Sequence, residues 1–81
     1  MDQEKISEGQ IRAARGLLGW SQAKLAERAG VSAMTVKRAE GSGSPSPAQG
    51  ARSAIRTALE AAGIVFLPEN GNGPGVAVKK R

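Results

Sequence analysis

Apolar residues recur at helical spacing near the start of the chain. The first stripe consists of Ile11, Ala14 and Leu18, which a helix places on one face. Ser7 and Gln10 before it have the spacing of a capping box, so the helix is expected to start near Glu8. Gly19 is expected to end it. Residues 1–7 are polar except for Met1 and Ile6, and we expect them to be a flexible, frayed segment.

Two shorter helical patterns follow, at residues 22–29 and 33–40. The first of them repeats apolar residues at Leu25, Ala26 and Ala29. Gly30 permits the left-handed backbone that ends a helix, and Ser21 and Ser32 can cap the two helix starts. Two short helices joined by a tight glycine turn are typical of the motif that places its second helix in a DNA groove.

A fourth helix is expected after a loop rich in glycine, serine and proline. Its apolar stripe is formed by Ala51, Ile55, Ala58, Leu59 and Ala62. Ser46 provides a cap with Pro47 at the first helical position, and Gly63 ends the helix. Trp20, at the corner between the first two helices, is expected to plug the core.

The pattern then changes to strands. Residues 64–67 are a continuous run of β-forming residues, and residues 76–78 follow a glycine-rich loop, which predicts a β-hairpin. The run is apolar on both strand faces, so one face is expected to meet a second copy of the chain. The expected dimer interface is Ile64, Val65, Phe66, Leu67, Val76 and Val78.

Composition narrows the function. The 81 residues contain no cysteine and no histidine, which removes the thiolate and imidazole groups that most metal sites and acid–base catalysts use. We therefore expect no enzyme activity, no metal and no cofactor. Net charge is +5, which suits an anionic partner. No apolar run approaches a membrane span and the N-terminus is unlike a signal peptide, so a cytoplasmic, nucleoid-associated protein is expected, with no small-molecule effector evident.

The helix at 33–40 has the chemistry of a reading surface. On a helical wheel Val36 and Ala39 point toward the core, and the opposite arc carries Ala33, Met34, Lys37 and Arg38. Lysine and arginine donate to guanine, while alanine and methionine contact the thymine methyl group. An ordinary amphipathic helix with a solvated basic face is the alternative, and the preceding helix and turn favour DNA.

Polar groups near the helix starts suit phosphate contacts. Ser21, Gln22 and Ser32 lie where free backbone amides already favour an anion, and Lys24 lies on the exposed face of its helix. Contacts of this kind fix the register on DNA without reading its sequence. Simple capping is the alternative role for the two serines, and it is compatible with a phosphate contact.

The segment resembles the Cro and phage-repressor type of helix-turn-helix, also called the XRE family. The resemblance covers about residues 10–62, and the family pattern is met at Gln22, Leu25, Ala26, Gly30, Val31, Ser32, Val36 and Glu40. It implies a mainly α, lambda-repressor-like bundle of four helices, here with a C-terminal hairpin. The resemblance and the apolar strand pattern together predict a DNA-binding part at 8–63 and a dimerisation part with a basic tail at 64–81.

The resemblance also implies roles for single residues. Gln22 would contact a phosphate and brace the reading helix, and Thr35 with Ser32 would lie near the DNA backbone. Arg15 on the first helix would pair with Glu40. The implied function is a transcriptional regulator that binds an inverted-repeat operator in double-stranded DNA as a homodimer. Ala33 lacks the polar group that such proteins often carry there, and the hairpin replaces the fifth helix of many relatives.

A protein-interaction module is the alternative function from another class. A small helical domain with an apolar C-terminal segment can bind a toxin or another regulator and use the helix-turn-helix only as a scaffold. The apolar run at 64–67 agrees with this function as well as with a dimer. A mobility-shift experiment on genomic DNA fragments distinguishes the two.

Overall fold

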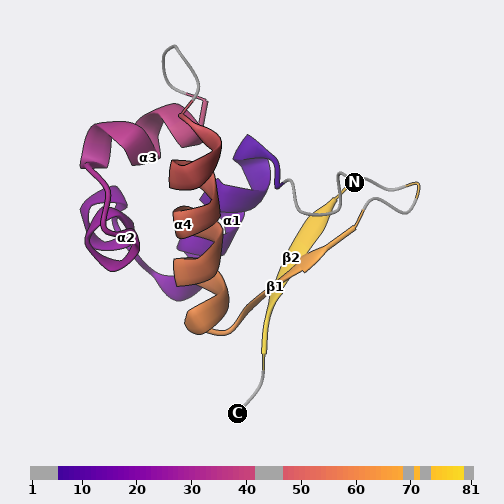
Figure 1. The fold of residues 1–81 in the computed structure, drawn as a ribbon. Coiled ribbons are helices and arrows are strands. Elements are labelled where there is room, and N and C mark those ends of the chain that lie inside the picture. Colours follow the sequence, from indigo (N-terminus) through magenta and orange to yellow (C-terminus); the bar gives the residue numbers. More distant parts are fainter. Residues whose placement is uncertain (1–5, 42–46, 69–70, 72–73, 80–81) are drawn as a thin grey trace.

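Four helices and a two-stranded antiparallel hairpin make up the fold of the described residues, as the sequence predicts (Figure 1). The computed structural model describes residues 6–41, 47–68, 71 and 74–79. The elements are α1 (Glu8–Leu18), α2 (Gln22–Ala29), α3 (Ala33–Ala39), α4 (Gln49–Ala61), β1 (Ile64–Leu67) and β2 (Gly75–Val78). In the described part of the chain no helix is long and apolar enough to cross a membrane.

The helix ends follow local capping chemistry. Ser7 and Gln10 form the predicted capping box, in which each side chain bonds the other residue's backbone N–H. Ser21 caps α2 and Ser32 caps α3. Gly19 and Gly30 end α1 and α2 at φ 70° and 73°, in the left-handed region that a side chain disfavours. The predicted limits of the first two helices are therefore confirmed.

Two predicted helix limits need correction. The fourth helix begins at Gln49 rather than Pro47, because Ala48 is extended at ψ 157° and its carbonyl accepts an early helical bond, from the N–H of Arg52. Ala48 offers no side-chain cap, and Ser46 lies outside the described residues. The third helix ends at Ala39, one residue early, because Glu40 leaves the helical conformation as its C-cap.

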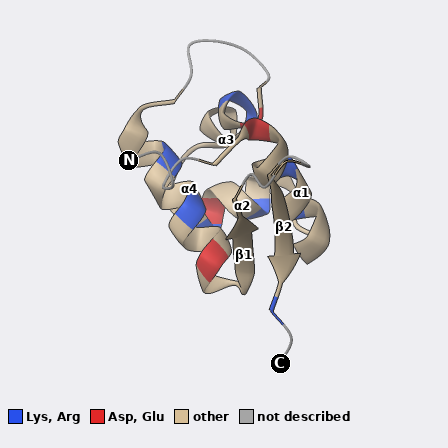
Figure 2. Ribbon diagram, turned by 90° about the vertical axis from the view of Figure 1, so that its right-hand side faces the viewer, with Lys and Arg blue, Asp and Glu red and all other residues tan. Residues whose placement is uncertain are grey.

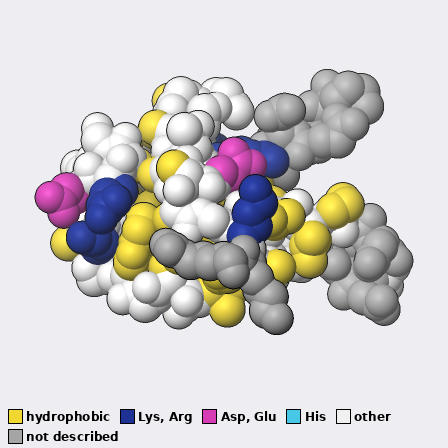
Figure 3. Space-filling view, turned by 90° about the horizontal axis from the view of Figure 1, so that it is seen from below, with side chains coloured by type: hydrophobic (Ala, Val, Ile, Leu, Met, Phe, Trp, Pro, Cys, Tyr) yellow, Lys and Arg dark blue, Asp and Glu magenta, His cyan; other side chains and the backbone are white. Residues whose placement is uncertain are grey.

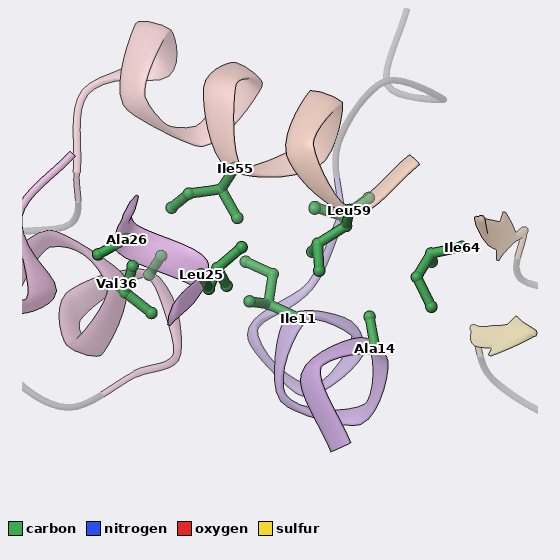
Figure 4. Packing of buried hydrophobic residues seen from close by; sticks show 10 residues of the cluster. Ile11, Ala14, Leu25, Ala26, Val36, Ile55, Leu59 and Ile64 are labelled. Carbon is green, nitrogen blue, oxygen red and sulfur yellow. The ribbon is translucent and has the colours of Figure 1, made fainter. Parts of the chain in front are cut away.

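The core lies between the helices and the hairpin (Figure 4). Its largest fully buried side chains are Ile11, Leu25, Ile55, Leu59 and Val36. All four helices therefore contribute to one apolar cluster, which is the main source of stability in a domain of this size. Trp20 only partly fills its predicted place, because it packs against the core half-buried while the guanidinium of Arg28 lies 5.4 Å from its ring centre.

The expectation of a frayed N-terminal segment fails at Ile6. This side chain is only 5% exposed and belongs to the core. Its backbone carbonyl accepts a hydrogen bond of 2.6 Å from Nη2 of Arg52 on α4. An apolar residue next to a helix cap can pack back on the helices, so the ordered structure starts before α1. Residues 1–5 lie outside the described part of the chain.

The hairpin packs one face on α1 and α4. In its register Ile64 faces Val78 and Phe66 faces Val76 across the strands. Ile64 is 3% exposed in the core, and Phe66 and Val76 pack against it. Figure 2 shows the two strands in front of the helices, so their other face is turned outward.

This burial divides the residues of the expected dimer interface between the two faces of the hairpin. Ile64, Phe66 and Val76 are used within one chain, because alternate residues of a strand share a face and this face covers the helices. Val65 and Leu67 lie on the outward face. Leu67 and Val78 are each 43% exposed. Val65 and Leu67 are therefore the residues of the expected interface that face a partner, while Val78 lies on the same face as Ile64.

Candidate DNA-binding surface

The turn between α2 and α3 is short, and the N–H groups of Gly30 and Val31 bond back to α2. Gly30 takes the left-handed conformation, and its N–H points back to the carbonyls of Ala26 and Glu27. The N–H of Val31 bonds the carbonyl of Ala26 at 3.0 Å. Leu25 and Ala26 of α2 and Val36 of α3 are buried in the shared core. This combination of turn and packing fixes the angle between the two helices.

α3 separates its core face from its outer face as predicted. Val36 and Ala39 are completely buried. On the opposite side Met34 is 50% exposed, and Ala33 and Lys37 are exposed as well. Arg38 is half-buried.

The outer face of α3 carries positive charge at its C-terminal end, where a helix favours cations. Lys37 and Arg38 occupy the last turn of α3, where the negative end of the helix dipole favours cations. In Figure 2 the basic positions of α3 lie at the upper end of the molecule, away from both strands. Two cations beside two small or flexible apolar groups give the helix donors for base edges and a surface for methyl groups.

The hydroxyl groups of Ser21 and Ser32 are exposed and already act as caps. Ser21 Oγ accepts from the N–H of Lys24 at 3.0 Å. Ser32 Oγ accepts from the N–H of Thr35 at 3.1 Å and lies 2.9 Å from the Thr35 hydroxyl. A hydroxyl that accepts one bond keeps its own proton for donation. The Ser21 hydroxyl can therefore cap its helix and still donate to an anion.

The buried carboxylate of Glu40, at the end of α3, joins this helix to α1 and α2. The Glu40 side chain is 2% exposed, and its Oε2 lies 2.7 Å from Nε of Arg15 on α1. Its Oε1 accepts from Arg15 Nη2 at 3.2 Å and from Gln22 Nε2 of α2 at 3.0 Å. The predicted pair is thus present, and Gln22 supports the end of α3 as the resemblance implies. With several donors the carboxylate is well satisfied despite its burial.

Arg12 also holds the end of α3, and the sequence interpretation did not identify it. Its Nη1 donates to the backbone carbonyl of Glu40, at the end of α3. The next residue, Gly41, has φ 98°, and a Cβ there would lie 2.8 Å from Oε1 of Glu8. Arg12 precedes the paired Arg15 by one helical turn, so the two lie on the same side of α1. That spacing is the signal that could have found it.

Comparison with known proteins assigns this part of the chain. Residues 11–48 match the family described as Helix-turn-helix. This segment belongs to the helix-turn-helix family of the Cro and phage-repressor type. The helix-turn-helix is a DNA-binding domain, so the protein is a DNA-binding regulator. No match to a curated protein was found.

The helix-turn-helix match includes most of the residues that the sequence singled out. It begins in α1 and covers all of α2, the turn and α3. Every candidate DNA contact falls inside it, and none of them is buried: Ser21, Gln22, Lys24, Ser32, Ala33, Met34, Thr35, Lys37 and Arg38. The hairpin and all of α4 lie outside the matched residues.

Proposed function

We propose that the protein is a sequence-specific transcriptional regulator that binds an inverted-repeat operator as a homodimer, with α3 in the major groove. The observation that carries the proposal is the outer face of α3. That face is solvent-accessible within a matched helix-turn-helix, while the ends of the helix are fixed by the turn and by Glu40. A rigid helix presenting donors outward is what direct base readout requires.

Base reading is assigned to the exposed arc. Lys37 and Arg38 would donate to guanine O6 and N7, and Ala33 with Met34 would contact thymine methyl groups. Backbone contacts are assigned to the helix starts, where the hydroxyls of Ser21 and Ser32 are exposed. Gln22, Lys24 and Thr35 would add further phosphate contacts, with the second N–H of the Gln22 side-chain amide left to donate because only one is needed for the bond to Glu40.

A homodimer follows from the small size of one reading helix. The seven residues of α3 span about 10 Å, which is only some three base pairs of duplex. Two copies in one complex double the sequence that is read, and two-fold symmetry makes the site an inverted repeat. The proposed layout is a DNA-binding part at 8–63 and a dimerisation part with a basic tail at 64–81, acting at the nucleoid.

The outer side of the hairpin is the surface proposed for the second copy. Figure 3, viewed from below, shows hydrophobic side chains on the right, where the hairpin lies. The N–H of Lys79 bonds the Gly63 carbonyl at 2.8 Å, and in an antiparallel ladder this places the Val65–Ala77 pair among the bonded pairs. The backbone groups of Ile64 and Phe66 then point to the open edge of β1. An open edge beside an apolar face favours pairing with an identical strand.

Selection of bound sequences from a random DNA pool tests the proposal. The expected product is one inverted repeat, bound by a dimer in sedimentation experiments and with an affinity that falls steeply as salt rises. Enrichment of no sequence, with a flat salt response, would contradict it.

The alternative of a protein-interaction module has one observation in its favour. Leu17 of α1 is 53% exposed and has no place in the proposed DNA or dimer surfaces. Under that alternative the random pool yields no enriched sequence and Leu17→Ser disrupts complexes with a protein partner.

A further inference from the structure

Gln10 joins the start of α1 to both strands of the hairpin. Its Nε2 donates to the carbonyl of Gly75 at 2.9 Å and to the carbonyl of Leu67 at 3.3 Å. Its Oε1 accepts from the N–H of Ser7 at 2.8 Å. The residue is 7% exposed. Both N–H groups and the oxygen of the amide are therefore engaged, and the side chain is held in one orientation.

The two ends of the hairpin are held in different ways. Ile64, at one end, is inserted in the core and is joined to α4 through Gly63, which has φ 105°. Leu67 and Gly75 pair at the other end, and there the bonds from Gln10 attach the strands to α1. Without those bonds no hydrogen bond from Gln10 would hold this end of the strands, and the hairpin would rely on the packing of Ile64, Phe66 and Val76. Its connection to α4 runs through a glycine, whose backbone has wide conformational freedom.

The same helix also holds the end of α3. Arg15 bonds the Glu40 carboxylate, and Arg12 bonds the Glu40 carbonyl. Gln10 therefore lies within two turns of both arginines on α1. Through this one helix the position of the hairpin is linked to the position of the reading helix.

We propose that Gln10 determines the spacing of operator half-sites that the dimer accepts. The inference rests on the proposed function, in which two hairpins meet and two α3 helices read DNA. Figure 1 places α3 and the hairpin at opposite sides of the molecule, whose longest extent is 30 Å. A tilt of roughly 10° over that length moves one end by about 5 Å, more than the roughly 3.4 Å between successive base pairs. A hairpin fixed by Gln10 selects one spacing, and a loose hairpin accepts several.

A spacing series tests this with the full-length chain. Duplexes carry the two selected half-sites with the spacer changed one base pair at a time, and affinity is measured by fluorescence anisotropy. Gln10→Glu keeps an oxygen for the Ser7 N–H but has no N–H for Leu67 or Gly75. Gln10→Met removes the polar group without adding charge. Ser7→Ala is the matched control, because it weakens the same cap and leaves both hairpin bonds in place.

The parent and Ser7→Ala are expected to prefer one spacing by roughly tenfold over its neighbours. In both Gln10 variants this preference is expected to fall below about threefold, while affinity for a duplex with a single half-site stays at the parental level. A preference as sharp as the parent's in both Gln10 variants would overturn the inference and leave the proposed function intact. An equal loss of affinity on single half-sites and operators would also overturn it, since Gln10 would then only support the fold. A parent without any spacing preference would refute the two-fold operator itself.

Discussion

At the scale of single residues, the reading surface and its support are made of different side chains. Lys37 and Met34 face solvent and make no contribution to the buried core. Glu40 is buried and bonds Arg15 and Gln22. Substitutions in the first group are expected to change DNA recognition, and substitutions in the second group to change stability.

Lys37→Ala and Arg38→Ala are expected to weaken operator binding more than binding to random DNA. Loss of one good base contact costs about 1–3 kcal/mol of discrimination, whereas a lost phosphate contact weakens both kinds of DNA equally. Competition mobility shifts with operator and random duplexes measure the difference. If both variants keep the parental ratio of the two affinities, α3 is not the reading helix.

Glu40→Gln is expected to lower the free energy of unfolding by about 3 kcal/mol, because Arg15 loses its buried counter-charge. The matched control is Glu60→Gln, which removes the exposed pair with Arg56 on α4 and is expected to cost less than about 1 kcal/mol. Urea denaturation followed by circular dichroism measures both. Equal effects of the two substitutions would show that burial of the Glu40 carboxylate is unimportant.

At the scale of elements, the sequence predicted what is decided locally. Caps and glycine stops depend on residues within one turn, so Ser7, Gly19 and Gly30 located the ends of the first helices correctly. The start of α4 was misplaced because Ser46 and Pro47 have good capping chemistry that the backbone at Ala48 does not use. The bond from Gln10 to Gly75 spans 65 positions, and no local pattern reveals it. Which strand face is buried depends likewise on the helices it meets.

Two glycines, one inside a helix and one at a helix end, are expected to respond oppositely to alanine. Gly16 lies inside α1 with nothing within 4 Å of an added Cβ, so Gly16→Ala should stabilise the protein by about 1 kcal/mol through helix propensity. Gly30 has φ 73°, so Gly30→Ala should destabilise it by about 1–2 kcal/mol through left-handed strain. Thermal melting of the two variants gives the signs, and a stabilising Gly30→Ala would contradict the turn geometry.

At the scale of the whole molecule, the hairpin has two roles on its two faces. Ile64, Phe66 and Val76 complete the core of one chain, while Val65 and Leu67 are turned away from it. Deleting the hairpin would therefore unfold the core as well as remove a dimer surface, and such a deletion cannot separate the two roles. A substitution on the outward face alone can.

Val65→Lys is expected to give a folded monomer with weak operator binding. A lysine on the outward face adds like charges at the two-fold contact and leaves the core residues unchanged. Thr57→Lys, at an exposed position of α4, adds the same charge elsewhere and is expected to remain dimeric. Sedimentation velocity compares them with the parent. Should Val65→Lys still sediment as a dimer, the interface lies on the helices.

The exposed arc of α3 has a consequence for how this protein changes over evolutionary time. Ala33, Met34 and Lys37 are exposed on a helix that is held by its buried face and its two ends. Substitutions at these three positions are therefore close to neutral for folding, since surface changes away from buried groups rarely exceed about 0.5 kcal/mol. Gene duplication followed by drift at a few codons would be enough to send a copy to a new operator. Regulators with this architecture can thus diverge in the operator they bind while keeping the same fold.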